Sequence, residues 1–133
     1  MREREGVSID DGRFGVRLTK GGAPNELGYP TIIEARAGPF QGSVLDNLLD
    51  YGEFGIQLVR LHRTLAGVAR LSSYEGFVLE VIGNGRGIET HVRIVGEHLP
   101  FVELKFPIQI DQSYLPAIIE QVEIEFPPPY RVL

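Results

Sequence analysis

The clearest pattern in this chain is the alternation of apolar and polar positions in its second half. In residues 88–95 and 102–110, apolar residues or threonine alternate with charged or polar ones. This period of two predicts half-buried strands, with one face on the core and the other in solvent. Residues 68–73 and 77–82 are expected to form two further strands. Pro107 cannot donate a ladder hydrogen bond, so its strand is expected to lie at a sheet edge or to carry a bulge.

Two segments instead follow the helical period of 3.6 residues. In residues 52–66, one apolar stripe is formed by Phe54, Leu58, Leu61 and Leu65. Gly67 is expected to end this helix. In residues 114–126, the stripe is formed by Leu115, Ile118, Ile119, Val122 and Phe126. We expect Ser113 to be the N-cap of this second helix, because Pro116 then falls in the first turn, where its missing N–H would be unpaired anyway.

The first half of the chain predicts three more strands. Residues 13–19 alternate, residues 31–37 are rich in β-branched side chains, and residues 40–45 follow a Gly-Pro turn. Residues 10–12 are expected to form a turn and residues 21–25 a loop.

Together these elements predict an α+β fold and a single domain over residues 1–133. We expect a mainly antiparallel sheet of about six or seven strands, with the two α-helices packed on one face. The last seven residues, 127–133, begin with three prolines and are expected to form an extended tail.

The glycine-rich segment 83–87 gives the strongest turn signal. Asn84-Gly85 is the pair favoured at the centre of two-residue hairpin turns, where both residues need positive φ. Glycine loops can also cradle phosphate groups. A dinucleotide loop, however, lies between a strand and a helix, whereas this segment lies between two predicted strands. We therefore expect a turn here and no nucleotide site.

Motifs for catalysis or metal binding do not emerge from the sequence. The chain has no cysteine, which excludes disulfides, zinc-thiolate sites and thiol catalysis. His62, His91 and His98 lack the spacing of metal ligands, and no serine lies in a nucleophile-elbow motif. Carboxylates are plentiful, but the sequence does not give the separation that paired carboxylates need for hydrolysis. We expect no catalytic residue, no cofactor and no metal, and an active site assembled from loops is the third-ranked alternative.

Charge narrows the class of partner. The net charge of −5, from 18 acidic and 13 basic residues, argues against nucleic acid and suits a basic protein partner. The first residues are charged and are not followed by an apolar run, so no secretory signal is expected. No apolar run reaches the roughly 20 residues of a membrane helix. These features predict a cytoplasmic protein that does not bind membranes.

The predicted partner-binding site lies on the exposed side of the last helix. Glu120, Glu123 and Glu125 surround Ile124 there, and acid around an apolar side chain is typical of a surface where a protein docks. A lone exposed isoleucine is also common on surfaces without such a function. An alternative acidic patch is formed by outward strand positions, namely Glu80, Glu89 and Glu103.

Three local patterns carry a family resemblance: Gly-Val-Ala-Arg-Leu-Ser-Ser-Tyr-Glu at 67–75, Leu-Glu-Val at 79–81 before the turn with Gly87, and Leu-Lys-Phe at 104–106 before Asp-Gln-Ser-Tyr-Leu at 111–115. With these patterns, residues 67–126 resemble a family of small bacterial proteins that includes the WapI-type immunity proteins.

The resemblance implies an intracellular antidote that binds and neutralises a polymorphic toxin, often a nuclease or another basic effector, without a cofactor or catalytic residue. Two alternatives stay open: a structural or regulatory interaction module, and a homodimer formed through the sheet edge.

Overall fold

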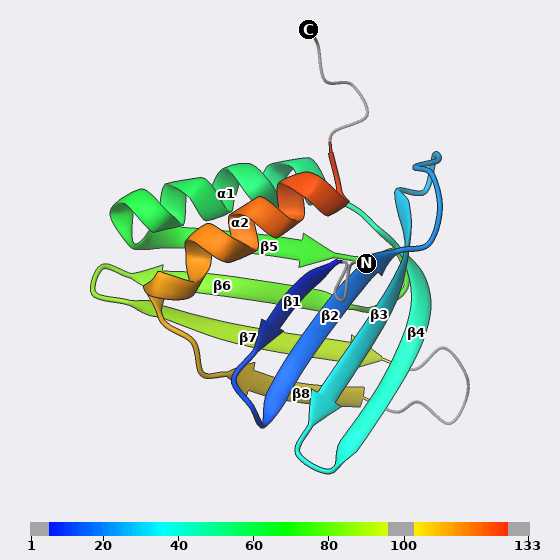
Figure 1. Ribbon diagram of the computed structural model, residues 1–133, viewed down its shortest axis with the longest axis horizontal. Coiled ribbons are helices and arrows are strands. Elements are labelled where there is room, and N and C mark those ends of the chain that lie inside the picture. Colours follow the sequence, from blue (N-terminus) through cyan, green and yellow to red (C-terminus); the bar gives the residue numbers. More distant parts are fainter. Residues whose placement is uncertain (1–5, 96–102, 128–133) are drawn as a thin grey trace, which may run out of the picture.

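The computed structural model describes residues 6–95 and 103–127 (Figure 1). The elements are β1 (Val7–Asp10), β2 (Phe14–Lys20), β3 (Tyr29–Ala37), β4 (Phe40–Leu48), α1 (Tyr51–Thr64), β5 (Ala66–Ser72), β6 (Val78–Asn84), β7 (Ile88–Val95), β8 (Glu103–Ile108), the 3₁₀ turn η1 (Gln112–Tyr114) and α2 (Leu115–Glu125). Our expectations for His98, for Val102 and for the tail after Pro127 lie outside the described residues.

Within residues 6–95 and 103–127, the strands form two antiparallel sheets of four strands each, in the orders β1-β2-β3-β4 and β5-β6-β7-β8. The predicted α+β class is therefore confirmed, but the expected single sheet of six or seven strands is wrong. Helix α1 separates β4 from β5, and the two strands form no ladder with each other in the described part of the chain. Leu48, the last residue of β4, instead forms an isolated bridge with Ser73, which directly follows β5. Figure 1 shows the two sheets crossing each other, with both helices on the same side.

The inward faces of both sheets and the apolar stripes of both helices form one hydrophobic core. The predicted alternation in β7 and β8 is confirmed in this core, where Thr90, Val92, Phe106 and Ile108 are buried. Phe14 of β2 stacks on Phe106 of β8 with ring centroids 5.8 Å apart, which holds the two sheets together at that point.

Helix α1 packs on β5, and α2 packs between α1 and β1. Figure 1 shows the two helices side by side and running in opposite directions. Phe54, Leu58 and Leu61 are buried as the helical period predicts. The side-chain oxygen of Gln121 on α2 accepts a hydrogen bond from the backbone N–H of Ser8 at 2.9 Å. This contact satisfies a donor at the edge of β1, which would otherwise be exposed.

The end of α1 differs from the expectation. The helix ends at Thr64, and Leu65 follows in the left-handed conformation with φ of 56°, while Gly67 lies within β5. The N–H of Leu65 donates to the carbonyl of Leu61. The carbonyl of Leu65 in turn accepts from the N–H of Gly85 at 2.6 Å. A tertiary contact thus accompanies a conformation that glycine usually supplies.

The expected N-cap Ser113 is also wrong, because Asp111 caps the short turn η1 that precedes α2. The carboxylate of Asp111 accepts from the N–H of Ser113 at 2.9 Å and from its hydroxyl at 2.5 Å. These hydrogen bonds, the one from the hydroxyl foremost, lower the pKa of Asp111. Pro116 lies in the first turn of α2, as predicted.

The β6–β7 hairpin has the predicted two-residue turn, shifted by one residue. The register pairs Gly83 with Ile88, which leaves Gly85 and Arg86 at the centre. Gly85 alone of these two has positive φ, at 90°. The side chain of Asn84 accepts from the N–H groups of Arg86 and Gly87, at 2.8 and 2.9 Å. Asn84 therefore stabilises the turn from outside its central pair.

Strand β8 lies at the edge of its sheet, so the expectation for Pro107 is confirmed. Just beyond β8, the N–H of Gln109 donates to Asp11 in the β1–β2 turn at 2.7 Å. Partial burial raises the pKa of Asp11, but the N–H groups of Gln109, Phe14 and Arg13 outweigh it, and the pKa lies below 3.8.

Candidate partner-binding surface

The outer side of α2 presents the predicted combination of acid and apolar surface. Glu120, Glu123 and Ile124 are exposed, and the side chain of Ile124 is 67% accessible. Neither glutamate forms an ion pair with another residue in the described part of the chain. We call these three residues the acidic arc.

Glu125 does not belong to the acidic arc, although the sequence analysis places it in the predicted partner-binding site. It is half-buried, and its carboxylate accepts a hydrogen bond from the backbone N–H of Lys20 at 2.8 Å. Lys20 ends β2, so Glu125 ties the end of α2 to the first sheet. Of the four predicted partner-binding residues, three are therefore available on the surface and one is occupied by a structural contact.

Two acids of the alternative patch on the second sheet are paired with arginines. Arg70 pairs with Glu80 at 3.7 Å and Arg93 pairs with Glu103, while the third acid, Glu89, lies 3.3 Å from the ring of His91. The hydrogen bond from Arg93 lowers the pKa of Glu103. This face carries a hollow of about 480 Å³, in whose lining Arg70, Arg93 and Lys105 outnumber the single acid, Glu80. A basic partner gains less from such a surface than from unpaired carboxylates.

Beside the acidic arc, α1 presents a surface of opposite charge. Ile56 and Val59, 54% and 37% exposed, line a hollow of about 410 Å³ together with Arg60, Arg63 and Thr64. We call it the basic hollow. The helical period puts Arg60 and Arg63 on the side of α1 opposite its apolar stripe, but we did not expect Ile56 and Val59 to be exposed there. The sequence does mark Ile56 and Val59, because they are apolar residues of the helix that lie outside the stripe of Phe54, Leu58 and Leu61.

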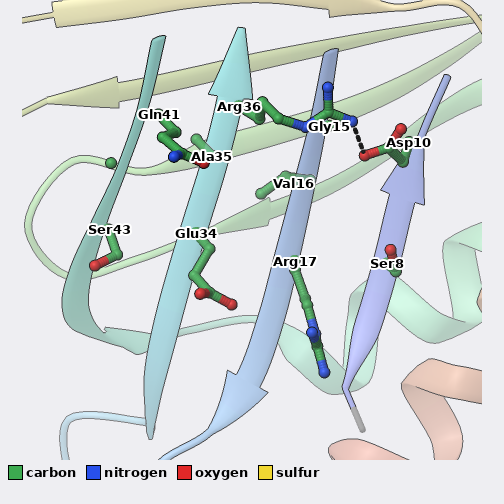
Figure 2. A pocket seen from close by; sticks show the side chains of 11 residues that line it. Ser8, Asp10, Gly15, Val16, Arg17, Glu34, Ala35, Arg36, Gln41 and Ser43 are labelled. Atoms are coloured by element: carbon green, nitrogen blue, oxygen red, sulfur yellow. Dashed lines mark hydrogen bonds and ion pairs between the residues drawn. The ribbon is translucent and has the colours of Figure 1, made fainter. Parts of the chain in front are cut away.

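The outer face of the first sheet carries a polar groove of about 430 Å³. Figure 2 shows Asp10 of β1 and Arg36 of β3 joined by an ion pair across β2, at 2.7 Å. Gly15 makes this contact possible, because a Cβ at that position would lie 2.2 Å from the carboxylate of Asp10. Arg17 and Glu34 lie in the next row of the groove (Figure 2). The ion pair of Asp10 with Arg36, and the opposite charges of Arg17 and Glu34 at facing positions of β2 and β3, are typical of a solvated sheet face.

An apolar hollow of about 330 Å³ lies where the β3–β4 hairpin approaches the second sheet. It is lined by Val44, Ile94 and Leu104, and by Phe40, whose side chain is 68% exposed.

A buried carboxylate joins the two sheets and explains one of the family patterns. Asp46, on β4, is 6% exposed, and it accepts from the hydroxyl of Ser73 at 2.5 Å, from the N–H of Glu75 at 3.0 Å and from the N–H of Asn47 at 2.7 Å. The hydroxyl oxygen of Ser73 also accepts from the N–H of Phe77 at 2.8 Å. The Ser-Ser-Tyr-Glu part of segment 67–75 is thus a structural junction.

Across residues 6–95 and 103–127, no three side chains of His, Cys, Asp or Glu lie close enough together to hold a metal ion. Within the same residues, neither helix combines the length and the apolar character that crossing a membrane requires.

A family model, the Immunity protein WapI-like family, matches residues 25–127. The match extends from the loop before β3 to the end of α2, and so includes both helices and the Asp46 junction. No curated protein and no solved structure matches the chain significantly. Because the family model covers well over half of the sequence, this chain belongs to the WapI-like immunity protein family.

Proposed function

We propose that this chain is an immunity protein that binds and neutralises a toxin domain with a basic surface, and that the toxin docks on the acidic arc. Family membership supports the immunity function. The observation that supports the docking site is that the carboxylates of Glu120 and Glu123 form no ion pair with any described residue and lie beside a 67% exposed Ile124. An antidote of this kind acts in the cytoplasm, and a chain without cysteine suits that compartment.

The physical basis is complementary charge around an apolar anchor. A toxin that acts on a polyanion presents a basic cleft, and an acidic protein can occupy or shadow that cleft. Exposed carboxylates accelerate the diffusional encounter, while a central apolar side chain that becomes buried supplies much of the affinity. Such inhibition needs only binding, so no catalytic group on this chain is required.

The test uses the C-terminal domain of the protein encoded next to this chain's gene as the binding partner. Its association rate is measured by surface plasmon resonance at low and high salt, for wild type and for the double variant Glu120→Lys/Glu123→Lys. We expect the variant to associate about tenfold more slowly at low salt and its association rate to depend less on salt, because the electrostatic attraction is weakened. Circular dichroism should show an unchanged fold, because surface substitutions cost about 0.5 kcal/mol or less.

The matched control is Glu89→Lys/Glu103→Lys, which changes the net charge equally on the second sheet. The control should associate at a rate much closer to wild type. If the helix variant binds at the wild-type rate at both salt concentrations, or if the control is slowed equally, the acidic arc is not the docking surface.

The alternative of a homodimer through the sheet edge stays a prediction. One feature favours it, because β8 is an edge strand. Pro107 weakens it, since proline leaves that edge without one of its donors.

A further inference from the structure

The two helices carry charges of opposite sign that remain unpaired among the described residues. Arg60 and Arg63 of the basic hollow form no ion pair there, and neither do Glu120 and Glu123 of the acidic arc. A Cβ added at Gly55 of α1 would lie 3.7 Å from Val122 of α2, so the two helices are in direct contact. The surface of this helical layer therefore changes from acidic to basic between neighbouring helices.

The two areas also have complementary compositions. The basic hollow is about 410 Å³ in volume, with Ile56 and Val59 as its apolar part and two guanidinium groups beside them. The acidic arc has an apolar side chain, Ile124, with two carboxylates beside it. An apolar centre with a charged rim is the usual anatomy of a protein interface.

Within one chain, the acidic arc and the basic hollow are both exposed to solvent on adjacent helices, so Ile124 of the arc does not enter the hollow. A second copy can bring them together. A two-fold axis that lies in the interface and is inclined to the helices places α2 of one copy across α1 of the other, and the same contact is then made twice.

We propose that two copies of this chain form a dimer through the helical layer, with the acidic arc of each copy seated against the basic hollow of the other. The assembly closes at two copies, because a two-fold contact uses both surfaces of each copy. The helices form this interface, and the β8 edge takes no part in it. The dimer covers the acidic arc, so dimerisation and toxin binding exclude each other; this last consequence alone rests on the proposed function.

Charge exchange tests the proposal without any toxin. The molar mass is measured by light scattering after size-exclusion chromatography at low salt, over a wide range of protein concentration. Wild type is expected to reach twice its chain mass of 14.8 kDa at high concentration. Glu120→Arg/Glu123→Arg should be monomeric, since arginines then face arginines. Arg60→Glu/Arg63→Glu should also be monomeric, since acids then face acids.

Mixing the two variants should restore a dimer that contains one copy of each, because every contact across that interface again joins opposite charges. This recovery separates a lost interface from a lost fold. Glu89→Arg/Glu103→Arg is the control and should still dimerise. The proposal is overturned if wild type is monomeric at all concentrations, if both charge variants still dimerise, or if the mixture stays monomeric.

Discussion

The carboxylate of Asp46 should be among the largest single contributors to stability, and Asp46→Ala tests this. Asp46 is 6% exposed and lies where β4 meets the segment after β5. Its two oxygens accept hydrogen bonds from Ser73, Glu75 and Asn47, at 2.5, 3.0 and 2.7 Å. In the variant, these three donors lose their acceptor. They lie close to the Leu48–Ser73 bridge, the one isolated β-bridge that the described residues form between the two sheets.

The expected magnitude follows from these contacts. A hydrogen bond to a charged acceptor contributes about 1.5–3 kcal/mol net, and three such bonds to one group are not additive. Water can reach part of the vacated site, because the N–H groups of Glu75 and Asn47 are only partly buried. We therefore expect Asp46→Ala to lower the free energy of unfolding by about 3–5 kcal/mol.

The assay is urea unfolding followed by circular dichroism. Asp10→Ala is the control, because its ion pair with Arg36 joins side chains that are 40% and 39% exposed, and its loss should cost about 1 kcal/mol or less. Combining Asp46→Ala with Ser73→Ala should cost clearly less than the two single changes added together, since both remove the same contact. If Asp46→Ala costs no more than Asp10→Ala, the junction does not hold the sheets together.

Three further predictions concern the core, the glycines and acid stability. Leu61→Ala and Phe106→Ala, at positions 1% and 5% exposed, should each lower the unfolding free energy in urea by about 2–5 kcal/mol, and near-neutral effects would contradict the assigned core. Gly55→Ala should raise the unfolding free energy by about 0.5–1 kcal/mol, because its new methyl group meets α2 at an ordinary 3.7 Å. Gly83→Ala should lower it by about 1–3 kcal/mol, because the methyl group would lie 2.5 Å from a backbone oxygen; equal thermal midpoints for the two variants would refute at least one of the two predictions. The folded state lowers the pKa of Asp11 below 3.8, so its contribution to stability is present above that pH and is lost as the pH falls through the lowered value. Thermal unfolding should show that Asp11→Asn loses less stability than wild type as the pH falls below 3.8. Equal losses in the two proteins would contradict the lowered pKa of Asp11.

Periodicity predicted both helices and most strands, because each has an apolar face long enough to repeat. Strand β1 was missed, since it contributes only two inward side chains, Val7 and Ile9, over four residues. The division into two sheets was also missed. Antiparallel patterning shows which face of a strand is buried, but it does not show whether two strands separated by a helix share a ladder.

The ends of elements escaped prediction where distant contacts decide them. Leu65 has the left-handed conformation that glycine usually adopts at the end of a helix. Its carbonyl accepts a hydrogen bond from Gly85, which lies 20 residues away in the sequence. The same reasoning applies to the candidate site. The helical period correctly placed Glu120, Glu123 and Ile124 on the surface, whereas the contact of Glu125 with Lys20 spans 105 residues and leaves no local signal.

The most direct test of the central claim is a growth measurement in cells. A candidate toxin, the C-terminal domain of a large protein encoded beside this chain's gene, is expressed from an inducible promoter, with this chain or with an empty vector. We expect that growth stops with the empty vector and continues with wild type, and that the Glu120→Lys/Glu123→Lys variant, folded and present at equal level, protects less. Growth arrest in the presence of soluble wild-type chain would contradict the immunity function.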